Sequence, residues 1–255
     1  MKISIYRSAF NLVRNHFQGW EESIRKSCDF ADEVVIAINT SSDGTLELIK
    51  DLGIPNLVIL ECDIPYSDPL LDGKLKNEAL QKCSGDVLIQ LDLDEYIPKW
   101  QKPIWIKYAE SLLDDFVSCY MIPCVDIYGD LNHYKSIGNK WYLHKRGLNR
   151  GPVNFARKED GTVDTHKSDT CELIDSEGNL LPSKIVPNDV SLLETNKIPF
   201  VVHLGYLDFS SRINRNKEFW GEHWIKESGG EEPPHKIHLS IDDFDEQIFE
   251  HNLNL

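Results

Sequence analysis

The sequence has no long apolar run, no closely spaced cysteine pair and no excess of basic residues. No apolar segment approaches the roughly 20 residues of a membrane-spanning helix, and the first residues lack the apolar core of a signal peptide. The six cysteines are scattered, which favours reduced, mostly buried thiols over disulfides or a zinc site. A formal net charge of -15 disfavours nonspecific binding to nucleic acid or anionic membranes. We therefore expect a cytoplasmic globular protein.

The composition is that of a folded domain with a substantial core. Hydrophobic residues make up 41% of the 255 positions and aromatic residues 10%. A chain of this length forms one large α/β domain or one domain with an elaborated extension. The sequence shows no internal repeat and no low-complexity segment.

Strand and helix signals alternate over the first half of the chain. Short apolar runs predict strands at 2–6, 33–38, 57–60 and 87–91. Apolar residues at helical spacing predict helices at 16–28, 45–52 and 72–82, with Asp72 as the N-cap of the third. This alternation predicts an α/β fold with a mainly parallel sheet, right-handed crossovers and helices on both faces.

The second half of the chain has a different character. It predicts strands within 116–128, 140–145 and 199–204 and a helix at 210–226, whereas 149–183 is polar and typical of long loops or an irregular subdomain. We therefore divide the chain into an α/β half (1–115), an irregular half that completes the same domain (116–228) and a C-terminal tail (229–255).

The most informative stretch is the strand that ends in an acidic cluster. The apolar run from Val87 to Leu91 is followed by Asp92, Asp94 and Glu95. Open α/β sheets bind their ligands at the carboxyl ends of the strands. Adjacent carboxylates repel one another and are costly to desolvate, so the cluster predicts a hard divalent cation, and a phosphate substrate to go with it.

Polar residues follow the other strands of the same expected sheet edge. One loop, after the first strand, contains Arg7 and Asn11. The loop at 39–45 could hold a base and ribose, although a turn with a helix cap explains it equally well when it is taken alone. The helix at 72–82 carries Lys74 and Asn77, which either reach a nucleotide or belong to a solvated helix face.

Taken in order, these segments resemble family 2 glycosyltransferases of the GT-A fold. ADEVVI at 31–36 with SDGT at 42–45 looks like the second strand and nucleotide loop of that family. KNEAL at 76–80 with SGD at 84–86 looks like the helix before its metal strand, and DLDE at 92–95 looks like its DXD-type motif. Further on, VVHLGY at 201–206 and the basic segment 212–219 resemble a subgroup related to lipopolysaccharide-core glucosyltransferases.

The resemblance implies a GT-A-type, Rossmann-like fold in which 1–115 binds a nucleotide-diphosphate sugar and 116–228 lies on the acceptor side. It implies Mn²⁺ or Mg²⁺ as cofactor, held by Asp94 and His203, with Asp92 binding ribose or a water on the metal. Glu95 would contact the sugar or orient its neighbours, unless it caps the following helix. The implied nucleotide-sugar-binding residues are Arg7, Asn11, Asn39, Ser41, Asp43, Lys74, Asn77, Asp92 and Lys217. Asn39 stands where the family often has aspartate, which puts the base preference in doubt.

An inverting transfer also needs a base for the acceptor hydroxyl. The subgroup usually supplies it in a His-Glu pair, and the nearest match here, DTHKSD at 164–169, has Lys167 in place of the glutamate. Asp164 and Asp169 are the substitute candidates, and solvated loop acids are their alternative reading. Trp100, Trp105, Trp141 and Tyr142 could stack on a sugar, but each is expected in the core.

The acceptor is not identified: a glycan, a lipid, a protein or a modified nucleic-acid base are all compatible with the sequence. Net acidity disfavours nucleic acid, although basic residues cluster at 135–158. A nucleotidyltransferase is the alternative enzyme, but the loop at 6–11 lacks the glycines that hold a triphosphate. A non-catalytic nucleotide-sugar- or carbohydrate-binding module is the third hypothesis, supported by the missing glutamate after His166.

Overall fold

The computed structural model describes residues 1–13, 19–40, 42–65, 71–146, 181–207, 249–250, 253 and 255. The strands are β1 (Ile3–Ala9), β2 (Glu33–Asn39), β3 (Leu57–Cys62), β4 (Val87–Gln90), β5 (Glu95–Tyr96), β6 (Cys119–Tyr128), β7 (His133–Lys145), β8 (Ser183–Ile185), β9 (Val201–Tyr206) and β10 (Phe249–Glu250). The helices are α1 (Trp20–Phe30), α2 (Thr45–Lys50), α3 (Leu71–Lys82), α4 (Lys102–Asp114) and α5 (Val190–Glu194), with a 3₁₀ turn at Lys99–Gln101.

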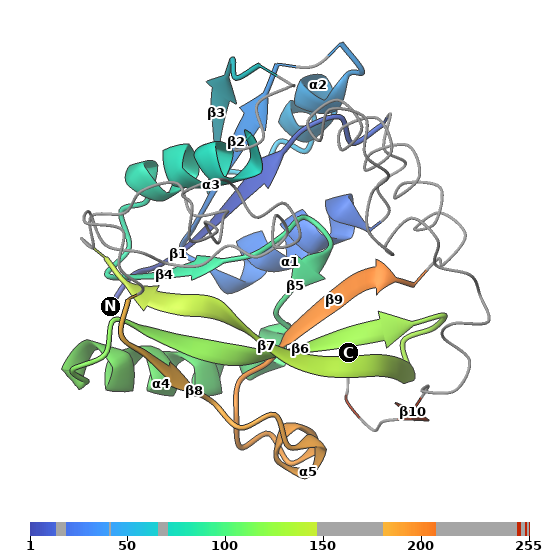
Figure 1. Ribbon diagram of the computed structural model, residues 1–255. Helices are drawn as coiled ribbons and strands as arrows, with labels where there is room; N and C mark the ends of the chain where they lie inside the picture. Colours follow the sequence, from blue (N-terminus) through green and yellow to red (C-terminus); the bar gives the residue numbers. More distant parts are fainter. Residues whose placement is uncertain are drawn as a thin grey trace, which may run out of the picture.

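The first half of the chain forms the parallel part of a mixed sheet (Figure 1). Strands β3, β2, β1 and β4 lie side by side in that order, and each adjacent pair is parallel. This is the strand order of a Rossmann-like fold, and it confirms the predicted α/β class. The sequence placed Arg7 in the loop after the first strand. Strand β1 in fact continues to Ala9, so Arg7 lies inside the strand.

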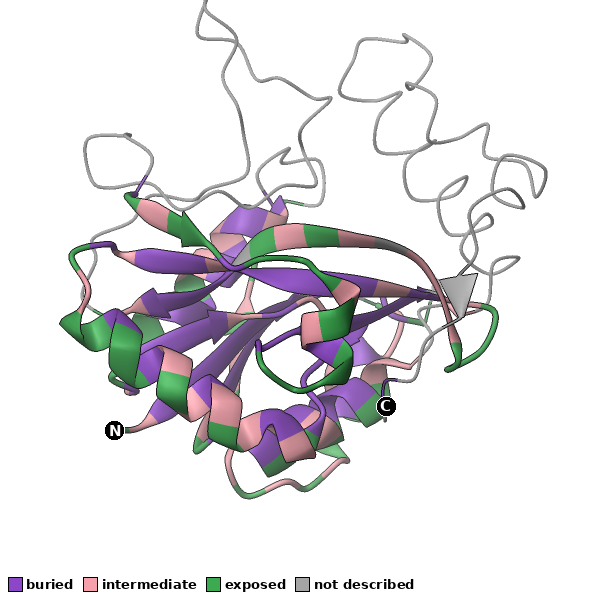
Figure 2. Ribbon diagram, turned by 90° about the horizontal axis from the view of Figure 1, so that it is seen from below, coloured by how far each residue is buried: buried purple, intermediate pink, exposed green. Residues whose placement is uncertain are grey.

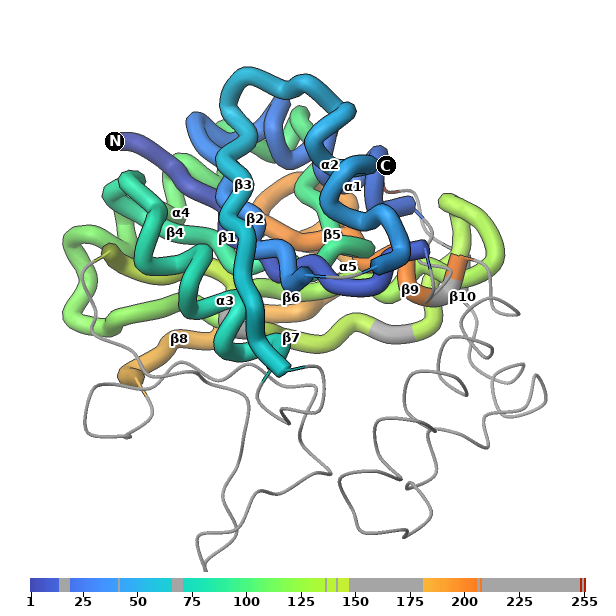
Figure 3. The backbone as a smooth tube through the Cα atoms, turned by 90° about the horizontal axis from the view of Figure 1, so that it is seen from above, coloured from blue at the N-terminus to red at the C-terminus, as the bar shows by residue number. Residues whose placement is uncertain are grey.

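Helices cover both faces of the parallel strands because successive side chains alternate between them. Val34, Ile36 and Ile38 of β2 face a core shared with α1, α2 and α4. Val35 and Ala37 face the opposite side, where they pack against α3. Figure 3 shows α3 and α1 on opposite sides of β1–β3, and Figure 2 shows buried positions concentrated on the strands.

The second half extends this sheet with mixed pairing. Strand β7 pairs antiparallel with β4 and with β6, and β9 then pairs parallel with β6. The order across the described sheet is therefore β3-β2-β1-β4-β7-β6-β9-β5, with β8 on β6 and β10 on β7. The predicted strands at 116–128, 140–145 and 199–204 are confirmed, although β7 begins earlier, at His133. The predicted helix at 210–226 lies outside the described residues.

Two further expectations can be compared with the structure. Asp72 is not the cap of α3: the helix begins at Leu71, and the Asp72 carboxylate accepts a hydrogen bond from the Ser8 hydroxyl. The five described cysteines are free thiols, as expected. Among the helices that the structure describes, none combines the length and apolar character needed to cross a membrane.

Candidate functional site

The acidic cluster lies in the turn between β4 and β5, at the carboxyl end of the parallel strands. The turn follows directly from Leu91, which is fully buried, and Glu95 opens β5. The three acids differ in exposure: the Asp92 side chain is 38% exposed, whereas Asp94 and Glu95 are buried. Asp92 therefore lies at the mouth of the site, with Asp94 and Glu95 behind it.

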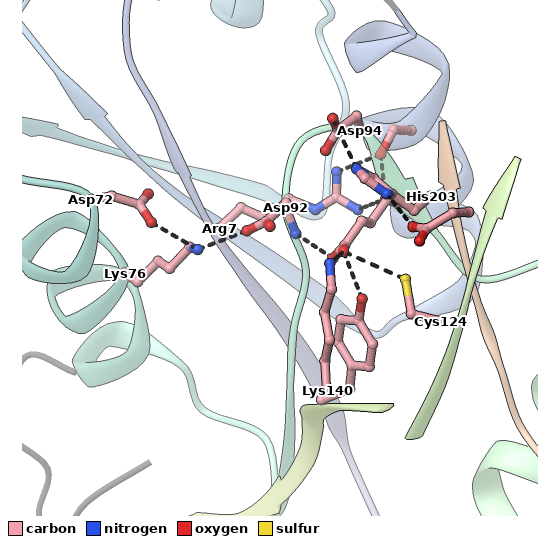
Figure 4. A network of polar contacts seen from close by, with 12 residues as sticks. Arg7, Asp72, Lys76, Asp92, Asp94, Cys124, Lys140 and His203 are labelled. Carbon is pink, nitrogen blue, oxygen red and sulfur yellow. Dashed lines mark hydrogen bonds and ion pairs between the residues drawn. The ribbon is translucent and has the colours of Figure 1, made fainter. Parts of the chain in front are cut away.

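Strand pairing brings a histidine and a second aspartate to Asp94. His203 of β9 is in register with Glu95 of β5 on one side and with Asp126 of β6 on the other. Its Nε2 lies 3.3 Å from Asp94 Oδ2, and its Nδ1 lies 2.6 Å from Asp126 Oδ1 (Figure 4). Burial opposes protonation of the imidazole, but the charge of Asp94 and the hydrogen bond to Asp126 prevail and raise the pKa of His203 to about 9.

The donor set fits a hard divalent cation. Two ligands in neighbouring positions of an octahedral Mg²⁺-type shell, each about 2.1 Å from the ion, lie about 3 Å apart. The 3.3 Å between Asp94 Oδ2 and His203 Nε2 is close to that separation. Metal-binding histidines commonly donate their second ring N–H to a carboxylate, which orients the ring. Asp126 occupies that position, so Asp94 and His203 could hold an ion with Asp126 behind them.

Glu95 is bound within the protein. Its Oε1 accepts hydrogen bonds from the Lys140 ammonium (2.5 Å) and the Tyr142 hydroxyl (2.6 Å). Its Oε2 accepts the backbone N–H of Asp92 (2.8 Å), which closes the acidic turn. The carboxylate is 1% exposed. It does not cap the following helix, which was one interpretation of the sequence.

A buried lysine of helix α3 forms an ion pair with Asp92. Lys76 of α3 is 6% exposed, and its Nζ lies 2.7 Å from Asp92 Oδ1 and 2.9 Å from Asp72 Oδ2. Burial by itself would raise the pKa of Asp92, but the charges of Lys76 and Lys140 outweigh it and lower the pKa below its usual value. Asp92 is therefore held ionised and fixed in direction.

Arg7 is fully buried beneath the turn. Its guanidinium donates to the hydroxyls of Ser23 and Ser27 in α1 and to the backbone carbonyl of Glu95 (2.7 Å). Burial disfavours the charge and lowers the pKa of Arg7 to about 10, although Glu95 and other acids oppose the shift. Arg7 thus fixes the backbone of the turn, and its side chain is fully buried.

The loop residues predicted to bind the nucleotide also support the protein backbone. The Asn39 amide exchanges two hydrogen bonds with the backbone of Ile64 (2.9 and 2.8 Å). Asp43 accepts hydrogen bonds from the backbone N–H and hydroxyl of Thr45, the first residue of α2, and from the N–H of Val13, while the N-cap position of α2 is Gly44. Together these contacts fix the loops that follow β1, β2 and β3.

Of the remaining predicted site residues, three are described by the structure and four are not. Asn11, two residues after the end of β1, has a left-handed backbone with φ 48°. On α3, Lys74 is half-buried, and the Oδ1 of Asn77 is buried and has no hydrogen-bond partner among the described residues. Four predicted site residues lie outside the described residues: Ser41, Asp164, Asp169 and Lys217.

The described aromatic side chains singled out in the sequence pack in the core, and the described basic residues bind groups of the protein. Trp105 and Tyr142 are buried in the core, as expected, and Trp100 packs against Phe200. Of the basic cluster, Lys140 binds Glu95, Lys145 binds the carbonyl of Asp115 and Arg146 binds that of Ser84.

Several residues of the site were not predicted from the sequence. Asp126 was not singled out at all, whereas Lys140 was noted only in a basic cluster, Tyr142 only as an aromatic that could stack on a sugar, and Lys76 only as part of a helix segment that could reach the nucleotide. Asp126 carried a signal of its own, because it is a carboxylate inside the otherwise apolar strand β6. The Cys124 thiol lies beside these residues. Cys124, Asp126 and His203 form a set of possible metal ligands whose ligand atoms lie within 4.8 Å of one another.

Comparison with known proteins gives likeness of structure alone. No family model matches the sequence, and no curated protein does. The chain is similar to S. aureus TarS in complex with UDP, with 15% identity, a TM-score of 0.47 and coverage of 89% of this chain and 68% of that one.

Two further solved structures are similar. One is the mannosyltransferase PcManGT from Pyrobaculum calidifontis in complex with GDP-Man and Mn²⁺, with 15% identity, a TM-score of 0.46 and coverage of 92% of this chain and 66% of that one. The other is a 4-diphosphocytidyl-2C-methyl-D-erythritol synthase from Anaerococcus prevotii, with 13% identity, a TM-score of 0.37 and coverage of 57% and 70%. Because all three TM-scores are below 0.5, the function is inferred from the residues of the site.

Proposed function

We propose that this protein is a metal-dependent, inverting glycosyltransferase that uses a nucleotide-diphosphate sugar. The observation that carries the proposal is the pair of buried groups Asp94 and His203, 3.3 Å apart beside the half-exposed Asp92. They lie at the carboxyl end of parallel strands, where such sheets bind nucleotides. Of the segments that resemble family 2 glycosyltransferases, 92–95 and 201–206 contribute these groups.

The charge balance of the site supports a divalent cation. The network in Figure 4 contains more carboxylates than permanent cations. The carboxylates are Asp72, Asp92, Asp94, Glu95 and Asp126, and the cations are Arg7, Lys76 and Lys140. With His203 neutral, as a metal ligand must be, two negative charges remain. A single Mn²⁺ or Mg²⁺ would neutralise them.

Breaking the bond between the sugar and the diphosphate develops negative charge on the diphosphate, and a divalent ion, when bound, supplies the counter-charge. Asp94 and His203 would hold the ion, and Asp126 would fix the imidazole. Lys76 directs Asp92, which we assign to the ribose. Arg7 and Glu95 hold the turn in place, so that these groups need little reorganisation during the reaction.

The remaining roles are proposals that rest on the sequence. The loops after β1 and β2 would contact the base, with Asn11 among the residues that bind it and with Asn39 and Asp43 also holding the backbone there. Asn77 and Lys74 approach from α3. Asp164 and Asp169 stay the candidates for the base that deprotonates the acceptor hydroxyl.

A thermal-shift panel of nucleotide sugars, with and without Mn²⁺, tests this function. A ligand at about 100 times its Kd stabilises the folded state by about 2.7 kcal/mol. We expect a metal-dependent rise in melting temperature with one of UDP-glucose, UDP-N-acetylglucosamine and GDP-mannose. We also expect donor hydrolysis to fall by about a hundredfold or more in Asp94→Asn, because the metal loses a ligand.

The matched control is Asp114→Asn, which removes one carboxylate from the exposed end of α4. It should behave as the unmodified protein does. Undiminished turnover by Asp94→Asn or by metal-stripped protein would contradict the proposal. Release of pyrophosphate from a nucleoside triphosphate would instead indicate a nucleotidyltransferase, and binding of a donor without hydrolysis or transfer would indicate a binding module.

A further inference from the structure

Lys140 lies next to the acidic turn although it comes from the other half of the chain. Strand β7 runs antiparallel to β4, with Leu143 opposite Ile89. Lys140 precedes Leu143 by three residues, and because the two strands are antiparallel it lies beyond Gln90, the last residue of β4, and level with the turn. Its side chain extends from β7 toward the turn in Figure 4.

The position of this ammonium group is fixed by a buried partner. Lys140 Nζ lies 2.5 Å from Glu95 Oε1, and the Lys140 side chain is 44% exposed whereas that of Glu95 is 1% exposed. Glu95 is itself held by the Tyr142 hydroxyl and the N–H of Asp92. A buried carboxylate thus holds the end of a side chain that is itself partly exposed.

Most of the hydrogen-bonding capacity of Lys140 remains available. A lysine ammonium has three N–H donors, and among the residues that the structure describes only Glu95 accepts one of them. The ion pair with Glu95 offsets its charge. Lys140 therefore suits a neutral oxygen acceptor better than it suits a phosphate, whose charge calls for an uncompensated cation.

The order of the strands indicates which part of a bound donor would lie there. The loops proposed for the nucleotide follow β1 and β2, on one side of β4, and β7 lies on the other side. The acidic turn lies between them and would bind the diphosphate through the metal. A donor extended along this edge would place its sugar at β7.

We propose that Lys140 binds a hydroxyl group of the transferred sugar and that Glu95 is the residue that positions it. This assignment rests on the proposed function. It makes the pair a determinant of which sugar is accepted, with Lys140 contributed by the second half of the chain and Glu95 by the first.

The test compares two ligands and two lysine variants by calorimetry in Mn²⁺. The ligands are the nucleotide sugar that gives the largest shift in the panel above and the matching nucleoside diphosphate. Lys140→Met should weaken nucleotide-sugar binding about tenfold, as expected for one hydrogen bond from a charged donor. It should change the Kd of the nucleoside diphosphate by less than about twofold.

The control is Lys50→Met, because Lys50 is also about half exposed (48%) and also paired with a glutamate, Glu61, at 2.7 Å. It should leave both affinities unchanged. Lys140→Met leaves the Glu95 carboxylate buried without its cation, so the double variant Glu95→Gln/Lys140→Met, which has no such charge, should show the same selective loss.

The outcomes separate the two proposals. Equal weakening of both ligands would assign Lys140 to the diphosphate or the metal, and no weakening would remove it from the site; either result overturns the inference and leaves the proposed function intact. Failure of the unmodified protein to bind any nucleotide sugar in the presence of metal would overturn both.

Discussion

At the scale of the residue, Asp126 tests how His203 is oriented. Its Oδ1 lies 2.6 Å from His203 Nδ1, so it fixes the ring with Nε2 directed at Asp94. Asp126→Asn keeps the shape of the side chain and removes its charge. Loss of such a partner typically costs 10–100-fold in metal affinity. We expect the Mn²⁺ concentration that half-saturates nucleotide-sugar binding to rise by about that factor.

A second aspartate–histidine pair provides the control for this prediction. Asp130 Oδ1 lies 2.8 Å from His133 Nδ1 in the turn between β6 and β7, where the Asp130 side chain is 55% exposed. Asp130→Asn should leave the Mn²⁺ dependence unchanged. If Asp126→Asn also leaves it unchanged, His203 is not oriented for a metal by this carboxylate.

The position of the acidic residues could be predicted from the sequence, but their contacts could not. A short apolar run that ends in three carboxylates indicates a strand and its carboxyl end by local pattern alone. The environment of Glu95 depends on Lys140 and Tyr142, which lie 45 and 47 residues away in the chain. The position of Arg7 was predicted wrongly for the same reason. A charged residue after an apolar run is typical of the start of a loop, and the sequence does not show that Ser23 and Ser27 are its buried hydrogen-bond partners.

At the scale of the element, Gly85 controls the junction between β1 and β4. A Cβ at this position would lie 2.7 Å from the backbone nitrogen of Ser4 and 2.9 Å from the carbonyl oxygen of Lys2. Because backbone atoms cannot move aside cheaply, Gly85→Ala forces the strands apart. Overpacking of this kind costs about 1–3 kcal/mol. We expect that loss in the free energy of unfolding measured with urea.

Gly138 is the matched position in β7. A Cβ there would meet no atom within 4 Å among the described residues. Gly138→Ala should be neutral or slightly stabilising, because alanine restricts the unfolded chain. Equal effects of the two substitutions would contradict the steric argument.

The two parts of the sheet differ in how well the sequence predicted them. Each strand of the parallel half is a short apolar run bounded by turns, so its position follows from local composition. Strand β7 begins with the polar stretch from His133 to Ser136, and its pairing with β6 contains register shifts. Its length is set by the neighbouring strand and not by its own pattern, so only its last residues were predicted.

At the scale of the whole molecule, strand β4 joins the two halves. It is parallel to β1 on one edge and antiparallel to β7 on the other. One hydrophobic cluster runs through both halves, from Ile5 in β1 to Val201 in β9. The proposed site lies where β4 joins the two halves, so its geometry depends on both halves being folded. The division into halves at residue 115 is therefore one of sequence character and not of separate cores.

This continuity predicts that a cavity in the second half destabilises the first. Leu143 of β7 is fully buried and lies opposite Ile89 of β4. Leu143→Ala should lower the free energy of unfolding by about 2–5 kcal/mol. In hydrogen exchange, we expect amides of β1 and β2 to lose as much protection as those of β6 and β7, since one cooperative unit opens as a whole. Leu113→Ala, at a position of α4 that is 41% exposed, should change little. If only the amides of β6 and β7 lose protection, the two halves open independently and the pairing of β4 with β7 does not couple their unfolding.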